Sequence, residues 1–369
     1  MKILTILGAR PQFIKAATVS RAINEFNANE RRLIKEVILH TGQHYDTNMS
    51  DVFFEEMDIP SPDYKLECGG LGHGAMTGRM LEKIEEIIEE EKPDWVLVYG
   101  DTNSTLAGAL AASKMHIRVA HIEAGLRSFN MAMPEEINRI LTDRVSNYLF
   151  CPTDTAVKNL EQEGFPFPTV TKVKQEILNV GDVMFDATLF YKSKAKETVN
   201  LEKWGLDEKG YALCTIHRAE NTDDQNRLES IFQALREISK IMPIILPLHP
   251  RTKKIISESS FSDLLSTLKV VDPLSYIETQ RLEMGAKLIL TDSGGMQKEA
   301  FFHKVPCITL RDETEWVETT DSGWNKLVSA NADKIVDVFS ETQAPEEQLK
   351  YYGDGQSASR IFNTLMNEY

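Results

Sequence analysis

Short apolar runs alternate with polar turns and helical segments along the whole chain. The runs cover residues 2–7, 37–41, 94–99, 118–122 and 148–151 in the first half, and 211–216, 244–248, 269–271, 287–290 and 307–310 in the second. Such short, continuous apolarity is typical of parallel strands that are buried on both faces. Because segments of helical composition separate the runs, the pattern predicts an α/β fold with two doubly wound parallel sheets joined by right-handed crossovers.

The length of 369 residues exceeds one ordinary core and predicts two domains. Prolines and glycines interrupt the pattern at residues 164–171, and a second alternating series begins at residue 211. We therefore expect Rossmann-like domains at 1–175 and 176–355. A final helix within 356–369 carries an apolar face with Ile361 and Leu365, so it is expected to pack onto another part of the protein.

The net charge narrows the class of binding partner, and the cysteines and apolar runs narrow the compartment. With 41 basic and 56 acidic residues the formal net charge is -15, which disfavours a nucleic acid or an anionic membrane surface as partner. The four cysteines lack CxxC or metal-like spacing, as expected for reduced core residues of a cytoplasmic protein. The apolar N-terminal run is too short for a signal peptide, and no apolar stretch reaches membrane-spanning length.

One stretch, residues 291–300, has the order strand, glycine-rich turn and helix. Ser293 is a candidate N-cap, and Gly294 and Gly295 would let a ligand approach amides that the helix leaves unpaired. Glu299 follows about one helical turn later, a suitable offset for a carboxylate that holds a ribose diol beside a bound diphosphate. A capped helix whose glycines serve packing alone is the alternative, and this stretch does not decide between the two.

Charged and other polar side chains follow most of the predicted strands, and the carboxyl ends of parallel strands converge on one crevice. They are Arg10, Lys15, Asp101, Glu123, Glu135 and Arg139 in the first half, and His217, Arg218, Asn221, His249 and Arg311 in the second. A single carboxylate after a strand is more often a helix cap, but its repetition favours a ligand site. The first strand lacks a following GxGxxG, and no HExxH or His/Cys cluster occurs, which argues against a dinucleotide cofactor and a metal.

The chain resembles the non-hydrolysing UDP-N-acetylglucosamine 2-epimerases in seven motifs that stand in the family's order. They occupy residues 8–15, 41–44, 100–105, 121–127, 134–139, 217–221 and 291–295. This resemblance implies the GT-B fold, with two Rossmann-like domains, the active site in the cleft between them and the final helix returning to the first domain. It also implies that residues 176–355 bind UDP, that no cofactor is used, and that the protein forms a homodimer.

The resemblance also implies roles for the strand-end residues. The family inverts C2 of a UDP-sugar by eliminating UDP and adding it back, because the proton at C2 beside an acetamido group is not acidic. Asp101, Glu123 and Glu135 match the catalytic carboxylates, and His217 matches the catalytic histidine. The predicted substrate-binding residues are Arg10, Lys15, His249 and Arg311 for anionic groups, Arg218 with Ser293, Gly294 and Gly295 for the diphosphate, Glu299 for the ribose, and Arg139 with Asn221 for the sugar.

Two departures from the family pattern bear on the substrate. Ala9 and Gln12 replace a more usual Thr and Glu. Residues 100–105 and 311–318 also look closer to a branch that acts on UDP-2,3-diacetamido-2,3-dideoxy-glucuronic acid for surface polysaccharide. UDP-N-acetylglucosamine is the alternative substrate, and a GT-B glycosyltransferase, a hydrolysing epimerase and a non-catalytic sensor are more distant alternatives. Gln43 and His44 match a loop that binds a second, activating UDP-sugar, although the neighbouring loops differ.

Overall fold

The computed structural model describes residues 1–29, 33–43, 54, 57–168, 174–248, 250–257, 259, 262–347 and 350–367. The chain forms two compact units, one of Met1–Ala187 with Lys350–Tyr369 and the other of Thr188–Leu349. The boundaries at 175/176 and 355/356 drawn from the sequence stay a prediction. Within the described ranges, no helix is both long enough and apolar enough to cross a membrane.

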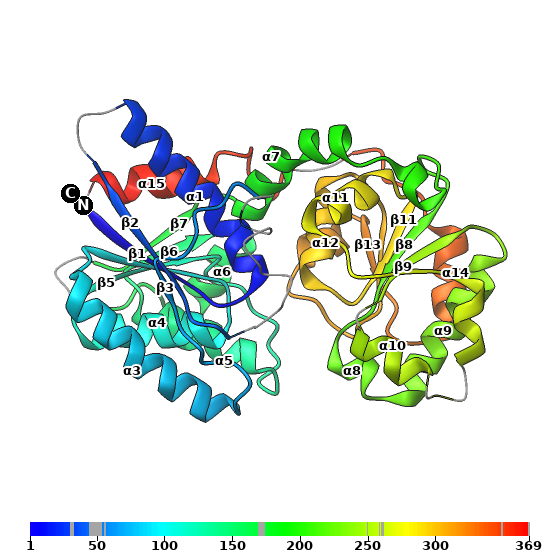
Figure 1. Ribbon diagram of the computed structural model, residues 1–369, viewed down its shortest axis with the longest axis horizontal. Coiled ribbons are helices and arrows are strands. Elements are labelled where there is room, and N and C mark those ends of the chain that lie inside the picture. Colours follow the sequence, from blue (N-terminus) through cyan, green and yellow to red (C-terminus); the bar gives the residue numbers. More distant parts are fainter. Residues whose placement is uncertain are drawn as a thin grey trace. The chain divides into compact units, whose positions relative to one another are not determined.

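The first unit alternates strands and helices from its first residues onward (Figure 1). Its elements are β1 (Lys2–Leu7), α1 (Arg10–Asn29), β2 (Lys35–His40), β3 (Tyr64–Lys65), α3 (His73–Glu91), β4 (Trp95–Tyr99), α4 (Asn103–Lys114), β5 (Arg118–Ile122), α5 (Pro134–Val145), β6 (Tyr148–Cys151), α6 (Asp154–Gln162), β7 (Glu176–Asn179), the first part of α7 (Val183–Thr198), and α15 (Ser357–Asn367).

The strands of the first unit form a parallel sheet in the order β3-β2-β1-β4-β5-β6-β7. One face packs on α3 and α4, where Leu4 and Val98 meet Ile84 and Ala107 in one apolar cluster. Helices α1 and α15 lie side by side on the other face (Figure 1). Both faces are covered, which explains why the central strands of the sheet are largely apolar.

The second unit repeats this plan. Its elements after α7 are η1 (Leu201–Trp204), β8 (Ala212–Thr215), α8 (Ala219–Thr222), α9 (Gln225–Ser239), β9 (Ile244–Pro247), α10 (Pro250–Ser257), η2 (Ser262–Thr267), β10 (Lys269–Val271), α11 (Tyr276–Gly285), β11 (Leu288–Thr291), α12 (Gly294–Phe302), β12 (Cys307–Thr309), α13 (Val317–Asp321), β13 (Asn325–Leu327) and α14 (Ala332–Glu341).

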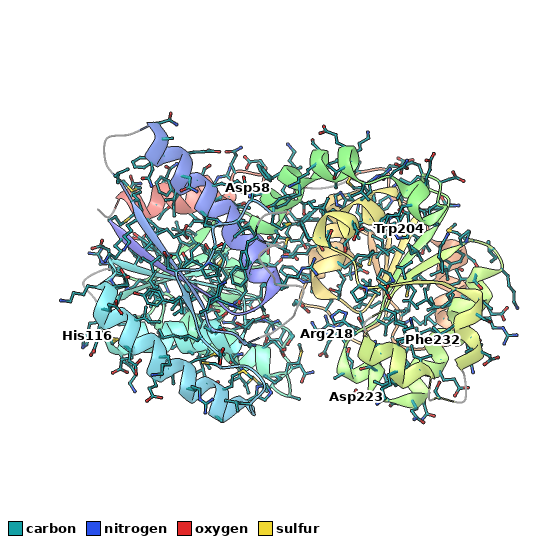
Figure 2. The ribbon with its side chains drawn as sticks, viewed as in Figure 1. Asp58, His116, Trp204, Arg218, Asp223 and Phe232 are labelled. Carbon is teal, nitrogen blue, oxygen red and sulfur yellow. The ribbon has the colours of Figure 1, made fainter. Side chains whose placement is uncertain are left out.

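Successive side chains of this second sheet enter two different apolar layers. Leu288 and Leu290 pack with the residues of α9, among them the fully buried Phe232 that Figure 2 labels. Ile289, which lies between them in β11, packs instead with Ala300 of α12. The strand order β10-β9-β8-β11-β12-β13 is again parallel, so the predicted pair of doubly wound sheets is confirmed.

The strand order reverses at one place in each sheet, between β1 and β4 and between β8 and β11. Loops at the carboxyl ends of such neighbouring strands diverge and leave room for a ligand. In the first unit these loops lead to Arg10 and Asp101, and in the second to His217 and Ser293. These four predicted site residues therefore lie at or beside the switch points of their own sheets.

Candidate active site

Asp101 follows β4 and is held by helix α5. Its carboxylate Oδ2 accepts hydrogen bonds from Nε and Nη2 of Arg139, at 3.0 and 2.7 Å. The main-chain oxygen of Asp101 accepts a third bond from Asn138, at 2.9 Å. The Arg139 side chain is only 3% exposed and that of Asp101 31%, so a buried cation fixes a carboxylate that solvent still reaches.

Glu123 follows β5 in a left-handed conformation with φ of 74° and is buried. Its Oε2 is in direct contact with Nζ of Lys15, which lies on α1 and was predicted to bind an anion. The two side chains form a buried ion pair, which fixes the position of the Glu123 carboxylate. Lys15 thus meets a carboxylate of the protein, and its contact with a ligand anion stays a prediction.

The two neighbouring glutamates of α5 differ in their surroundings. Glu136 is buried, accepts the amides of Ser128 and Phe129 at 2.8 to 3.1 Å, and contacts Nη1 of Arg139 at 2.7 Å. Burial alone would raise the pKa of Glu136, but these hydrogen bonds lower it overall. Glu135 is half-buried and forms no ion pair with another described residue. The geometry makes Glu136 a support for Arg139 and leaves Glu135 available.

Gln12 supports the loops after β1 and β4. Its Oε1 accepts the amides of Gly8 and Ala9 at 2.7 and 3.0 Å, while its Nε2 donates to the carbonyl oxygen of Tyr99 at 2.6 Å. An ionised glutamate could not donate to that carbonyl, which gives the glutamine at this position a local physical reason. Gln12 therefore fastens the two strand ends of the first switch point together.

The remaining predicted residues of the first unit are placed as follows. Arg10 is the first residue of α1 and is half-buried. The side chain of Gln43 accepts hydrogen bonds from the amide and hydroxyl of Ser104, at 2.9 and 2.7 Å, so it is tied to the start of α4. His44 of this unit and His249 of the second lie outside the described residues.

The start of α12 has the predicted capped geometry. Ser293 is the N-cap, and its hydroxyl accepts the amide of Met296 at 3.4 Å. A methyl group on Gly294 would lie 2.5 Å from Glu315 Oε1, so the buried Glu315, which Arg311 holds, would have to shift. A methyl group on Gly295 would meet only Ser293 Oγ, at 3.9 Å, in the part of the chain described. The two glycines thus serve different purposes, close packing at Gly294 and open approach at Gly295.

Asp292, one residue before the cap, organises the loop after β8. It is fully buried and accepts the amides of His217 and Arg218 at 3.0 to 3.1 Å and the amide of Asn221 at 3.2 Å. His217 Nδ1 lies 3.1 Å from Asp292 Oδ1, and its ring is 53% exposed. Burial would raise the pKa of Asp292, but the contact with His217 and the other hydrogen bonds lower it overall. A buried carboxylate therefore orients a histidine whose other nitrogen can face a ligand.

The other predicted ligands of the second unit vary in exposure. Arg218, labelled in Figure 2, is half-buried at the start of α8. Asn221 is fully buried, where it also donates to Leu310 O at 3.0 Å, so its contact with a sugar stays a prediction. Arg311 is 2% exposed, and its Nη1 lies 3.1 Å from Glu315 Oε2. Because Glu315 is also the neighbour of Gly294, Arg311 holds a carboxylate beside the start of α12.

Glu299 lies in a buried polar network. Gln280 Nε2 donates to Glu299 Oε1 at 2.9 Å and to Glu283 Oε2 at 3.1 Å, and His303 Nε2 lies 2.8 Å from Gln280 Oε1. Burial, and then the charge of Glu299, raise the pKa of Glu283. Glu299 itself is 7% exposed, so this polar network lies almost wholly inside the second unit.

Sequence reasoning missed three supporting residues, Asp292, Gln280 and Glu136. Asp292 was visible in the motif before Ser293, but its partners lie more than 70 positions away. Gln280 lies in an unremarkable helix, and nothing in its sequence context indicated a site. Among the described residues, no group of histidine, cysteine and carboxylate side chains could hold a metal ion.

Comparisons with known proteins extend over the whole chain. The family model described as UDP-N-acetylglucosamine 2-epimerase matches residues 27–366. UDP-2,3-diacetamido-2,3-dideoxy-D-glucuronate 2-epimerase of Pseudomonas aeruginosa is 54% identical over 370 residues, which cover 99% of this chain and 99% of that protein. A UDP-N-acetylglucosamine 2-epimerase homolog of Methanococcus maripaludis is 51% identical over 374 residues, with 100% of both chains covered.

A solved structure supports the architecture. The crystal structure of Methanocaldococcus jannaschii UDP-GlcNAc 2-epimerase in complex with UDP-GlcNAc and UDP matches with a TM-score of 0.89 and 44% identity, covering 100% of both chains. With the two parallel sheets described above, this match confirms the predicted GT-B class of fold.

Proposed function

Because this chain belongs to the UDP-N-acetylglucosamine 2-epimerase family, we propose that it inverts C2 of a UDP-2-acetamido sugar by eliminating UDP and adding it back. The family and the isomerase class predicted from the seven motifs are confirmed. The proposed substrate is UDP-2,3-diacetamido-2,3-dideoxy-glucuronate, which would become its manno epimer, because the relative named for this substrate is 54% identical. UDP-N-acetylglucosamine is the alternative, since a relative named for it is 44% identical.

The chemistry requires groups that move a proton at C2 while the bond from C1 to the diphosphate oxygen breaks. A base removes the C2 proton, the electrons form a C1–C2 double bond, and UDP leaves. Return of a proton to the opposite face and re-addition of UDP at C1 give the epimer. Since the two faces of C2 are served in turn, the reaction needs more than one acid or base group.

The observation that carries the proposal is the ionic pairing of two strand-end carboxylates. Lys15 contacts Glu123, and Arg139 contacts Asp101, so a buried cation holds each of these carboxylates near the end of its strand. We assign Asp101, Glu123 and Glu135 to proton transfer at C2. The role of Glu135 is supported by its position on α5, beside the residues that hold Asp101.

The second unit is assigned to UDP. The amides at the start of α12 favour a diphosphate, and the open space above Gly295 allows it to approach. His217 and Arg218, whose amides Asp292 fixes, would stabilise the charge that develops on the leaving diphosphate. Glu299 would hold the ribose, and Arg10 and Arg311 are further candidates for anionic groups.

The same proposal implies a biological role, a compartment and an oligomeric state for the protein. A diacetamido uronate of this kind would serve bacterial surface polysaccharide, such as the O-antigen of lipopolysaccharide. We further propose a cytoplasmic homodimer that needs no added cofactor. Sedimentation of the purified protein tests the dimer, with a mass near twice the 41.8 kDa of the chain expected.

Deuterium exchange tests the function directly. The protein is incubated in D2O with the diacetamido uronate or with UDP-N-acetylglucosamine, and NMR follows both the C2 position and the products. Deuterium at C2 of recovered substrate and epimer is expected, with faster turnover of the uronate. Release of UDP and free sugar would instead indicate a hydrolysing enzyme. No exchange with either substrate would contradict the epimerase proposal.

A further inference from the structure

His121 occupies the centre of β5 and is completely buried. Its Nδ1 lies 2.7 Å from Asp143 Oδ1, and its Nε2 lies 2.7 Å from the carbonyl oxygen of Gly100. Gly100 immediately precedes Asp101, to which the proposed function assigns proton transfer. His121 itself has no place in that mechanism, although it stands in one of the seven motifs.

Both nitrogens of this ring face oxygen atoms that accept hydrogen bonds. A carbonyl oxygen has no proton to give, so an unprotonated Nε2 at 2.7 Å from Gly100 O would set two lone pairs against each other. Nε2 must therefore carry a proton. The second proton of the network lies between Nδ1 and Asp143, on one or the other.

The surroundings of Asp143 decide where that second proton lies. Asp143 Oδ2 accepts Nη1 of Arg127 at 2.7 Å and the amide of Gly125 at 3.2 Å. Burial would raise the pKa of Asp143, but the contacts with His121 and Arg127 lower it overall. Oδ2 accepts two hydrogen bonds, one of them from a guanidinium, which favours the ionised carboxylate and places the proton on His121.

The formal charges of this network balance when His121 is protonated. Arg127 also forms two bonds, at 2.7 and 2.8 Å, to Glu163, whose side chain is 33% exposed. The network then holds two cations, His121 and Arg127, and two anions, Asp143 and Glu163. The other titratable group beside it, the buried Cys151, has a pKa raised by burial and then by Asp143. A buried cation is tolerable only when it is paired in this way.

Helix α5 thus reaches the Asp101 segment at three points. Arg139 binds the carboxylate of Asp101, Asn138 binds its main-chain oxygen, and Asp143 acts through His121 on the carbonyl of Gly100. Arg139 and Asp143 are four positions apart and share one helix face. The left-handed Gly100, with φ of 64°, also donates its amide to Ile122 O at 2.9 Å, so both main-chain polar groups of the residue before Asp101 are held by hydrogen bonds.

We infer that His121 is a doubly protonated imidazolium, with Asp143 as its counterion, and that it positions Asp101 by holding the carbonyl of Gly100. The positioning part of this inference rests on the proposed function. His121 touches neither substrate nor reacting atoms, so it is a positioning residue. Because a small misplacement of a catalytic group can cost about 10²-fold in rate, its removal should lower kcat strongly.

Neutron diffraction on the deuterated wild-type protein tests the protonation state without any variant. Deuterons on both ring nitrogens of His121 and none on the Asp143 carboxyl are expected. A ring with a single deuteron would overturn the inference. This result does not depend on whether the protein is an epimerase.

Two substitutions of His121 separate positioning from general structural damage. A glutamine amide reaches the place of Nε2 and can still donate to Gly100 O, whereas an asparagine amide reaches only the place of Nδ1, beside Asp143. His121→Asn should lower the rate of C2 exchange by about 10²-fold and His121→Gln by at most about tenfold. KM and the affinity for UDP should change less than about twofold in both, because the chemical step alone depends on Asp101.

His40→Asn is the matched control. His40 lies in β2 of the same sheet, is largely buried, and has no place in the proposed mechanism. This variant should retain wild-type kcat even if its thermal stability falls. Equal losses of kcat in the two His121 variants, or a parallel loss in the His40 variant, would overturn the positioning role. A wild-type protein without any C2 exchange would instead refute the proposed function.

Discussion

At the scale of single residues, buried carboxylates with several donors define the geometry of the second unit. Asp292 is fully buried, and its two oxygens accept main-chain amides of His217 and Arg218. The ionised form makes all of these bonds, whereas a protonated carboxyl would lose part of them. Because the pKa of Asp292 is lowered in the folded protein, its ionised carboxylate stabilises the fold as well as orienting the loop after β8.

Asp292→Asn should change the pH dependence of stability. Since the folded pKa of Asp292 lies below the ordinary value of 3.8, its contribution is fully present above that value and is lost as pH falls through the folded pKa. We expect the variant to be less stable by about 2 kcal/mol near neutral pH. The difference should shrink in acid, which urea unfolding at a series of pH values measures.

Asp337→Asn provides the comparison for this experiment. Asp337 is exposed on α14 and forms no ion pair with another described residue. Its variant should follow the wild-type stability at every pH. A constant difference between wild type and Asp292→Asn down to strongly acidic pH would contradict the assignment of an ionised, stabilising Asp292.

The sequence predicted the role of a residue well where its hydrogen-bond partner lies only a few positions away in the chain. Ser293 caps α12 as expected, because the cap and the amide it accepts are three positions apart. The pairing of Lys15 with Glu123 was not predicted, since it spans 108 positions and depends on strand order. For the same reason the sequence did not separate the structural Glu136 from Glu135, two adjacent carboxylates with different partners.

At the scale of elements, strands were predicted where they are apolar on both faces. The apolar runs at 2–7 and 118–122 correspond to β1 and β5 with the same bounds. Three strands were missed, β3, β7 and β13, which are only two to four residues long and carry polar residues. Edge strands need apolar residues less than central ones, so hydrophobic pattern alone does not reveal them.

The start of α12 supplies a paired prediction for two adjacent glycines. Gly294→Ala should destabilise the protein by about 1 to 3 kcal/mol, because the methyl group would lie 2.5 Å from Glu315 Oε1. Gly295→Ala should leave stability unchanged or raise it by up to about 1 kcal/mol, since its site is open and helical. The same methyl group should nevertheless lower UDP affinity by about tenfold, because it occupies the approach to the amides.

Thermal unfolding and calorimetric titration with UDP measure the two effects. We expect Gly294→Ala to lose stability but to keep its affinity for UDP. We expect Gly295→Ala to keep its stability but to lose affinity for UDP. Unchanged UDP affinity in Gly295→Ala would show that the diphosphate does not approach this helix start, and the helix would then be capped for structural reasons alone.

At the scale of the whole molecule, each unit has its own sheet and its own predicted chemistry. The alternation of strands and helices was enough to predict two doubly wound sheets, and the motif order was enough to predict the family. The boundary between the two units was harder to predict from the sequence, because α7 runs from the first unit into the second without a change in composition. The carboxylates proposed for proton transfer lie in the first unit, and the proposed UDP ligands of the α12 start lie in the second.

This division predicts that chemistry and UDP binding can be removed separately. Asp101→Asn should lower C2 exchange by about 10³-fold, because an amide cannot accept the proton. Arg139 would keep Glu136 as its partner, so the first unit should still fold. UDP at about 100 times its Kd should still stabilise Asp101→Asn by about 2.7 kcal/mol, as it does the wild type. Gly295→Ala should need more UDP for the same effect.

Calorimetric scans with and without UDP compare the wild type with these two variants. Loss of the UDP effect in Asp101→Asn would make Asp101 a ligand or a structural residue, and proton transfer would then fall to Glu123 and Glu135.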